Sequence, residues 1–337
     1  MLKLITNEFA KIFHRKGTYV LLVLVLLFGV LTNVVLKMDS SYETYDENGQ
    51  VITESSNKKS PEEILKKDLT STKAAYDLAL KGGDKFEITS AKQAYELVKY
   101  QVDNNITAAL VQNSTTVDSN NEFLKAFYRT PSVMSLISIL MIIIAAGMIA
   151  REFSDGTIKF LLINPVSRAK IFWSKYLTCI IMGIASSVVF FVFMLIVSAI
   201  FNGADGIGGS YVYYANDTVQ SYSALLYVAK RCGYTAIGIL ASFTLSFAIS
   251  SLLRSSSLAI GLSLGVEMAG STISAMLLVF GQDWGRYLIF SNTDLESIAS
   301  GSSLYANQTV PFALGVIGVH MIVFLLAGYD AFTRREV

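Results

Sequence analysis

The chain is poor in charge, cysteine and histidine, and each shortage excludes a class of protein. Only 16% of its 337 residues are charged, against roughly 25% in soluble domains, which excludes an ordinary soluble enzyme. Two Cys cannot build a disulfide scaffold, and two His leave no ligands for a His-rich metal site or a Ser-His-Asp site. The 27 Lys and Arg nearly balance the 26 Asp and Glu, so no basic surface predicts nucleic acid as a partner. We therefore expect neither a catalytic nor a metal site.

Long apolar stretches are what the sequence has instead. A bilayer-spanning helix needs about 20 mostly apolar residues, and six stretches qualify. They cover residues 17–36, 131–150, 176–204, 232–253, 255–280 and 308–329. None alternates apolar with polar residues as a barrel strand does, and the chain has only four Pro to interrupt helices. The pattern predicts an all-α polytopic membrane protein with six transmembrane helices.

The distribution of basic residues predicts the orientation of these helices. Short cytoplasmic segments of membrane proteins are enriched in Lys and Arg. With the N-terminus inside, the inner segments hold 12 Lys and Arg, and the short outer segments hold 3. We therefore expect both termini in the cytoplasm and the long polar segment 38–130 outside.

Residues 38–130 are predicted to form an extracellular helical hairpin insert between spans one and two. One helix is expected over residues 60–81. A second is expected over residues 88–109, where apolar residues recur at alternating spacings of three and four. Two interpretations remain open, a rigid stalk or lid and a receptor for an extracellular ligand such as a peptide.

The remaining chain divides into three parts. Residues 1–16 are predicted to form an amphipathic helix in the membrane interface, ahead of the first span at 17–37. Residues 131–337 form a five-span core, which contains the cytoplasmic loop 151–175. In that loop a short apolar helix, Ile158–Ile163, is bracketed by turn-forming residues. Such a helix either lies flat among the lipid headgroups or docks in a groove of a soluble partner.

The loop carries a spaced set of residues that resembles the first cytoplasmic loop of ABC-2-type transporter permeases, the type V ABC exporter fold. The set reads Glu152-x3-Gly156-Thr157, then Pro165-x2-Arg168, then Lys175. The N-terminal Glu8-Phe9-x-Lys11-Ile12 and the basic tail from Phe332 also resemble this family. The similarity covers the six-span layout, and the insert at 38–130 resembles the subset with an enlarged first extracellular loop.

This resemblance implies that the short inner helix is the coupling helix, seated in a groove of a separate ATPase subunit. The ATPase-coupling residues that it implies are Glu152, Gly156, Thr157, Ile158, Phe160, Leu161, Leu162, Pro165, Arg168 and Lys170. It further implies two copies of the ABC ATPase subunit, a second permease copy or a sister permease, and contact with membrane lipid. A partly re-entrant outer segment is expected at 281–307.

The chain lacks a phosphate-binding loop of the G-x-x-x-x-G-K-[ST] type. We therefore expect no ATPase activity and no cofactor in this chain, with ATP and Mg bound by the partner. The resemblance implies export across the bacterial plasma membrane. Because most spans carry no fixed charge, we expect an amphipathic cargo, a peptide, drug or lipid-like molecule, and with it a role in antimicrobial-peptide or multidrug resistance. The alternatives are a sensor or immunity protein that binds an extracellular peptide, and an ion-coupled carrier that uses Glu267.

Two ionisable residues lie inside predicted spans. Glu267 lies near the middle of span five, where a charge costs roughly 2.5–3.5 kcal/mol on insertion scales. His320 lies in span six. Each is interpreted either as a residue of the translocation path or as a hydrogen-bonded packing contact. The sequence leaves open whether the two side chains meet.

Overall fold

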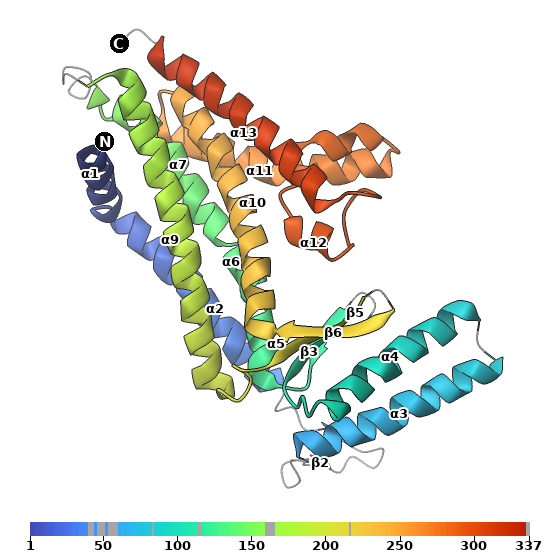
Figure 1. The fold of residues 1–337 in the computed structure, drawn as a ribbon. Helices are drawn as coiled ribbons and strands as arrows, with labels where there is room; N and C mark the ends of the chain where they lie inside the picture. The colour runs from blue at the N-terminus through green and yellow to red at the C-terminus, as the bar shows by residue number, and fades with distance from the viewer. Residues whose placement is uncertain are drawn as a thin grey trace. The chain divides into compact units, whose positions relative to one another are not determined.

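The computed structural model describes residues 1–39, 44–45, 51–52, 60–82, 84–113, 116–158, 166–215 and 217–334. The chain forms two compact units, and the ribbon in Figure 1 follows it through both. Unit 1 comprises Met1–Leu27, Pro131–Phe191 and Arg231–Val337. Unit 2 comprises Phe28–Thr130 and Val192–Lys230. The sequence predicts a five-span core over residues 131–337. By their contacts, residues 192–230 of that range fall in unit 2, together with most of the segment 38–130.

Within the described residues, six helical segments are long and apolar enough to cross a membrane. They are α2 (Lys16–Asp39), the run of α5 (Glu122–Tyr128), α6 (Thr130–Met134) and α7 (Ile137–Ser154), then α9 (Arg168–Asn202), α10 (Ala224–Leu252), α11 (Ser256–Val279) and α13 (Val310–Thr333). The predicted helical class is therefore confirmed, and these six candidate spans agree in number with the six predicted ones. The second segment begins at Glu122 rather than at residue 131, because two short helices precede α7.

The burial of these segments is that of a membrane protein. Of the apolar window, 72% is buried in the α5–α7 segment and 67% in α10, against 11% in α2 and 11% in α13. Large apolar side chains on the outward faces are more than half exposed, among them Val20, Leu27, Val319 and Leu326. Soluble monomers rarely expose apolar patches of this extent. The chain is therefore a multi-pass membrane protein.

Small side chains let the central helices of unit 1 approach closely. Ala146 and Ala150 of α7 pack against Ala259 of α11. The hydroxyl of Ser250 on α10 accepts hydrogen bonds from the backbone N–H groups of Ile149 and Ala150, both at 3.0 Å. Close backbone approach through small residues is typical of helices packed within a membrane.

The segment between α11 and α13 folds back along α11. It contains the 3-10 turns η2 (Asp283–Tyr287) and η3 (Ile289–Ser291) and the short helix α12 (Leu295–Ala299). The ring of Phe290 leaves room only for Gly at position 270, because a Cβ there would lie 2.3 Å from the ring. The Tyr305 hydroxyl also donates to the carbonyl of Ser274 at 2.8 Å.

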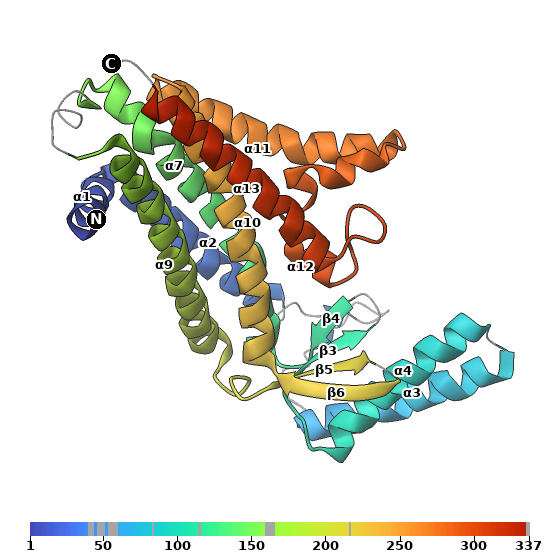
Figure 2. The same ribbon diagram turned by 45° about the horizontal axis from the view of Figure 1, so that its top comes forward.

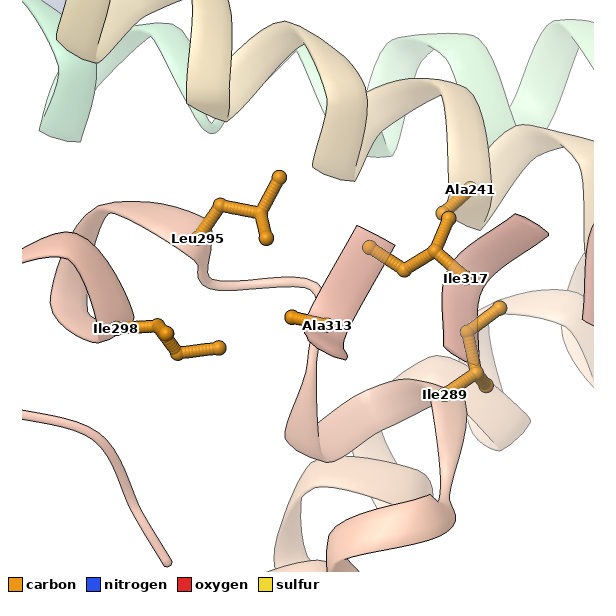
Figure 3. Packing of buried hydrophobic residues seen from close by; sticks show 6 residues of the cluster. All are labelled: Ala241, Ile289, Leu295, Ile298, Ala313 and Ile317. Carbon is orange, nitrogen blue, oxygen red and sulfur yellow. The ribbon is translucent and has the colours of Figure 1, made fainter. Parts of the chain in front are cut away.

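An apolar cluster holds this returning segment against α10 and α13. Figure 3 shows its six side chains gathered around one space. They are Ala241 of α10, Ile289 of η3, Leu295 and Ile298 of α12, and Ala313 and Ile317 of α13. The position of α12 is thereby fixed from its apolar side.

Unit 2 contains the predicted hairpin, with α3 (Pro61–Gly82) packed on α4 (Lys85–Asp103). Ser60 and Glu63 form a reciprocal N-terminal cap on α3. The helix α4 ends at Asp103, not at residue 109 as the spacing predicted. Asn105 takes a positive φ of 53°, and Ala109 begins a strand.

A small sheet in unit 2 was not expected from the sequence. Its strands are β3 (Ala109–Asn113), β4 (Thr116–Ser119), β5 (Ser210–Ala215) and β6 (Thr218–Ser223), in the order β4-β3-β5-β6. The strands β3 and β5 are parallel, with Leu110 opposite Tyr211. A separate two-stranded pair joins β1 (Thr44–Tyr45) and β2 (Val51–Ile52). Figure 2 shows the sheet beside α4, whose Leu97 shares a buried core with Ala109 and Val212.

Candidate functional site

Four charged side chains from three helices form an ion cluster in unit 1, in which all but Lys11 are buried. Lys175 of α9 has a side chain only 1% exposed, and its Nζ lies 2.8 Å from Glu8 Oε2 and 2.7 Å from Glu152 Oε1. The Nζ of Lys11 contacts the same two carboxylates, at 3.0 Å from Glu8 and 2.8 Å from Glu152. The cluster therefore joins α1 (Leu2–Phe13) to the end of α7 and the start of α9.

Two cations and two carboxylates balance each other in this cluster, which is what permits their burial. Burial by itself disfavours the ionised form of Glu8, but Lys175 and Lys11 outweigh it and lower the pKa of Glu8 below 4.5. Burial likewise opposes the charge on Lys11, but Glu152 and Glu8 outweigh it and raise the pKa of Lys11 above 10.5. Both shifts keep Glu8 and Lys11 ionised at neutral pH. Within the described residues, Glu152 Oε2 is buried without a hydrogen-bond partner.

The cluster borders both ends of the link between α7 and α9. Gly156 has a φ of 68°, a conformation that suits Gly and ends α7. Thr157 is exposed and Ile158 is buried. At the other end, the Ser167 hydroxyl accepts the backbone N–H of Lys170 at 3.4 Å, and the Lys170 side chain is exposed. Four expected coupling residues, Phe160, Leu161, Leu162 and Pro165, lie outside the described residues.

The end of α13 packs against the start of α9 and is hydrogen-bonded to it. Arg168 Nη1 donates to the carbonyl of Thr333 at 3.0 Å. The ring of Phe172 packs against those of Tyr329 and Phe332, with centroids 5.5 Å and 6.0 Å away. The helix α1 and the end of α13 both lie at the same end of unit 1 as the start of α9 (Figures 1 and 2).

A groove of about 740 Å³ runs beside the ion cluster, between α1 and the facing ends of α7 and α9. Its wall includes Lys11, His14, Arg15 and Arg151. Burial and the like charge of Arg151 lower the pKa of Arg15. This part of unit 1 thus combines a rigid ionic joint with a partly basic groove.

A second candidate site is a polar cavity of about 440 Å³ around Glu267, which lies midway along α11. Seven hydroxyl side chains line it: Ser132, Ser135, Ser138, Thr235, Ser242, Thr293 and Ser297. Three carboxylates, those of Glu267, Asp294 and Glu296, also line it. The Ser242 hydroxyl donates to Glu267 Oε1 at 2.6 Å. The sequence singled out Glu267 but not the Ser and Thr residues around it, which come from three separate stretches of the chain.

The other two carboxylates of the cavity have partners of their own. Arg231 donates from Nε to Glu296 Oε1 at 3.0 Å, and Nη2 contacts the same oxygen. Asp294 caps α12 by accepting the backbone N–H and the hydroxyl of Ser297, at 3.1 Å and 2.6 Å. Arg231 of α10 therefore has an acidic partner on α12.

His320 lies apart from the cavity, and is not among the residues that line it. Its Nδ1 is 2.9 Å from the carbonyl of Val316 in its own helix, and its ring lies against Phe324. The structure therefore does not bring Glu267 and His320 together. Within the described residues, no three His, Cys, Asp or Glu side chains are grouped to hold a metal ion.

Comparison with known proteins gives the family. Residues 99–337 match a family described as "Protein of unknown function (DUF2705)". The chain is 30% identical to "Uncharacterized protein YhcI" of Bacillus subtilis (strain 168), over all of this chain and 99% of the relative. It is also 30% identical to "Uncharacterized membrane protein YdbK" of the same organism, over 65% of this chain and 85% of the relative. The chain therefore belongs to the family of proteins of unknown function designated DUF2705.

Proposed function

We propose that the chain is the membrane-spanning permease subunit of an ATP-driven exporter in the bacterial plasma membrane. Two permeases, either two copies or this chain and a sister, enclose the path, and two copies of a separate ATPase subunit bind ATP and Mg. The observation that carries the proposal is the ion cluster of Glu8, Lys11, Glu152 and Lys175, which unites α1 with the end of α7 and the start of α9. The presence of an uncharacterised membrane protein among its relatives agrees with this setting.

Force applied at the link reaches the flanking helices through short connections. Gly156 and Ser167 mark the two helix ends, so few residues separate the link from α7 or α9. The contact between Lys175 and Glu152 then resists separation of the two helices, because a buried ion pair is costly to break. The bond from Arg168 to the end of α13 adds a further helix. Closure of the ATPases tilts these helices as a group.

The helix α7 connects the ion cluster to the Glu267 cavity. Glu152 lies near one end of α7, and Ser138, which lines the cavity, lies near the other. At 1.5 Å per residue, the two positions are about 21 Å apart along the helix. A tilt of α7 driven from the link therefore changes the shape of the cavity. The cargo that passes is an amphipathic peptide, drug or lipid-like molecule.

Purification of the tagged chain from its native cells in mild detergent tests the proposal. Mass spectrometry of the eluate is expected to find a soluble chain with a phosphate-binding loop, in a one-to-one ratio with the permease. A chain that elutes without any ATPase, under conditions where it remains folded, contradicts the proposal. In that case the hairpin of unit 2 becomes the first place to look for a sensor function.

A further inference from the structure

We infer that the cavity around Glu267 binds a protonated amine, an ammonium group with N–H donors carried on a small apolar body. That such an amine is the exported cargo rests on the proposed function. That the cavity binds an amine does not depend on the proposed function. It rests on the charges, the hydroxyl groups and the size of the site.

The first support is the charge of the lining. Among the described residues that line the cavity there are three carboxylates and no Lys, Arg or His. Glu296 is held by Arg231, and Asp294 is occupied as the cap of α12. Among the described residues, the Ser242 hydroxyl is the only hydrogen-bond donor to Glu267. A carboxylate midway along a membrane helix gains most from a cationic partner, because charge-assisted bonds strengthen where water is scarce.

The second support is that most of the lining hydroxyls already donate their hydrogen within the chain. Five of the seven lining hydroxyls donate to acceptors of the chain itself. They are Ser135 to the Ser132 carbonyl, Thr235 to the Arg231 carbonyl, Ser242 to Glu267, Thr293 to the Phe290 carbonyl and Ser297 to Asp294. A hydroxyl that donates its hydrogen keeps its lone pairs as acceptors. The cavity therefore has an excess of acceptors, and a ligand with several N–H donors complements it.

The third support is size. A volume of about 440 Å³ exceeds what a bare ion needs, and it falls within the range of small-molecule sites. Apolar side chains, including Ile239 and Leu295, form part of the wall. Leu295 is fixed in the apolar cluster of Figure 3, so this wall is preformed. With the ammonium group bound at Glu267, an apolar body attached to it fills the rest of the cavity.

A fluorescence titration of the purified full-length chain tests the inference. The probe is dansylcadaverine, whose primary amine is protonated at pH 7, and the matched neutral probe is its N-acetyl derivative. Saturable binding of the amine is expected, with the neutral probe at least tenfold weaker. Glu267→Gln keeps the shape but removes the charge, so we expect it to weaken the amine at least tenfold and to leave the neutral probe unchanged.

Two further variants keep the outcome interpretable. Asp283→Asn removes an exposed carboxylate of unit 1 outside the cavity and is expected to leave both dissociation constants unchanged. Ser138→Met fills the cavity but keeps Glu267, and is expected to weaken both probes. Equal binding of the amine by wild type and Glu267→Gln, or of both probes by wild type, overturns the inference. Neither result affects the test for a co-purifying ATPase, so the two proposals fail separately.

Discussion

Lys175→Met is expected to lower the free energy of unfolding by about 3 kcal/mol, at the lower end of the cost of breaking a buried ion pair from one side. The substitution leaves the carboxylates of Glu8 and Glu152 buried, with Lys11 as the remaining cation of the cluster. Because Lys11 contacts both, part of the loss is compensated. The measurement is denaturant unfolding of the purified chain in mixed micelles. Hydrogen exchange of α1 gives a local readout, because α1 should exchange faster in the variant than in wild type.

Two controls separate the charge effect from lost packing. Lys92→Met removes a partly exposed pair with Glu96, 3.7 Å apart, and should change stability by less than about 1 kcal/mol. The double variant Lys175→Met with Glu152→Gln removes one charge of each sign, so it should regain most of the loss. If the single Lys175 variant is as stable as wild type, or the double variant regains no stability, the ion cluster does not hold α1, α7 and α9 together as we describe.

The pH dependence of stability gives the same cluster a second signature. Because the pKa of Glu8 is lowered, its contribution to stability is complete above pH 4.5 and is lost as pH falls through the folded-state value. Glu8→Gln removes this contribution. The acid limb of the stability profile should therefore be shallower in Glu8→Gln than in wild type.

The double substitution Leu161→Asp and Leu162→Asp is expected to reduce the co-purifying ATPase at least tenfold. In the proposed function these side chains bind an apolar groove of the ATPase, and burying a carboxylate without a partner costs several kcal/mol. The measurement is the ratio of ATPase to permease after purification, by quantitative mass spectrometry. The amount of permease in the membrane fraction should not change, because the link lies outside the spans.

A matched pair of leucines controls for the added charge. Leu78→Asp with Leu80→Asp places two carboxylates at exposed positions of α3, where the leucines are 73% and 54% exposed. This variant is expected to retain the ATPase in full. Retention of the ATPase by the Leu161 and Leu162 variant as well would show that the coupling residues lie elsewhere.

Local sequence patterns predicted the helices well, because hydropathy and helix caps act over short distances. The six spans and the Ser60 cap of α3 follow from such patterns. The sheet does not, since β3 pairs with β5 across about a hundred residues and the strands are only four to six residues long. The Tyr-Val-Tyr run of β5, followed shortly by the turn-forming residue Asp217, was the signal that the sequence offered.

The candidate sites, like the sheet, depend on contacts between residues that are far apart in the sequence. The sequence singled out Glu8, Glu152 and Lys175 separately, as members of motifs, but no local pattern states that their charges meet. Glu267 stood out as a charge in an apolar span, whereas the hydroxyls around it looked like ordinary Ser and Thr. Their common role appears only when α12 and its flanking turns fold back against α10 and α11.

Photo-crosslinking from position 160 tests the central claim most directly. The unnatural residue p-benzoylphenylalanine replaces Phe160 in one preparation and Phe86, an exposed side chain of α4, in another. The account predicts a light-dependent adduct from position 160 to a soluble chain with a phosphate-binding loop, and none from position 86. Adducts from position 160 to lipid or to this chain alone, or an ATPase adduct from position 86, would contradict it.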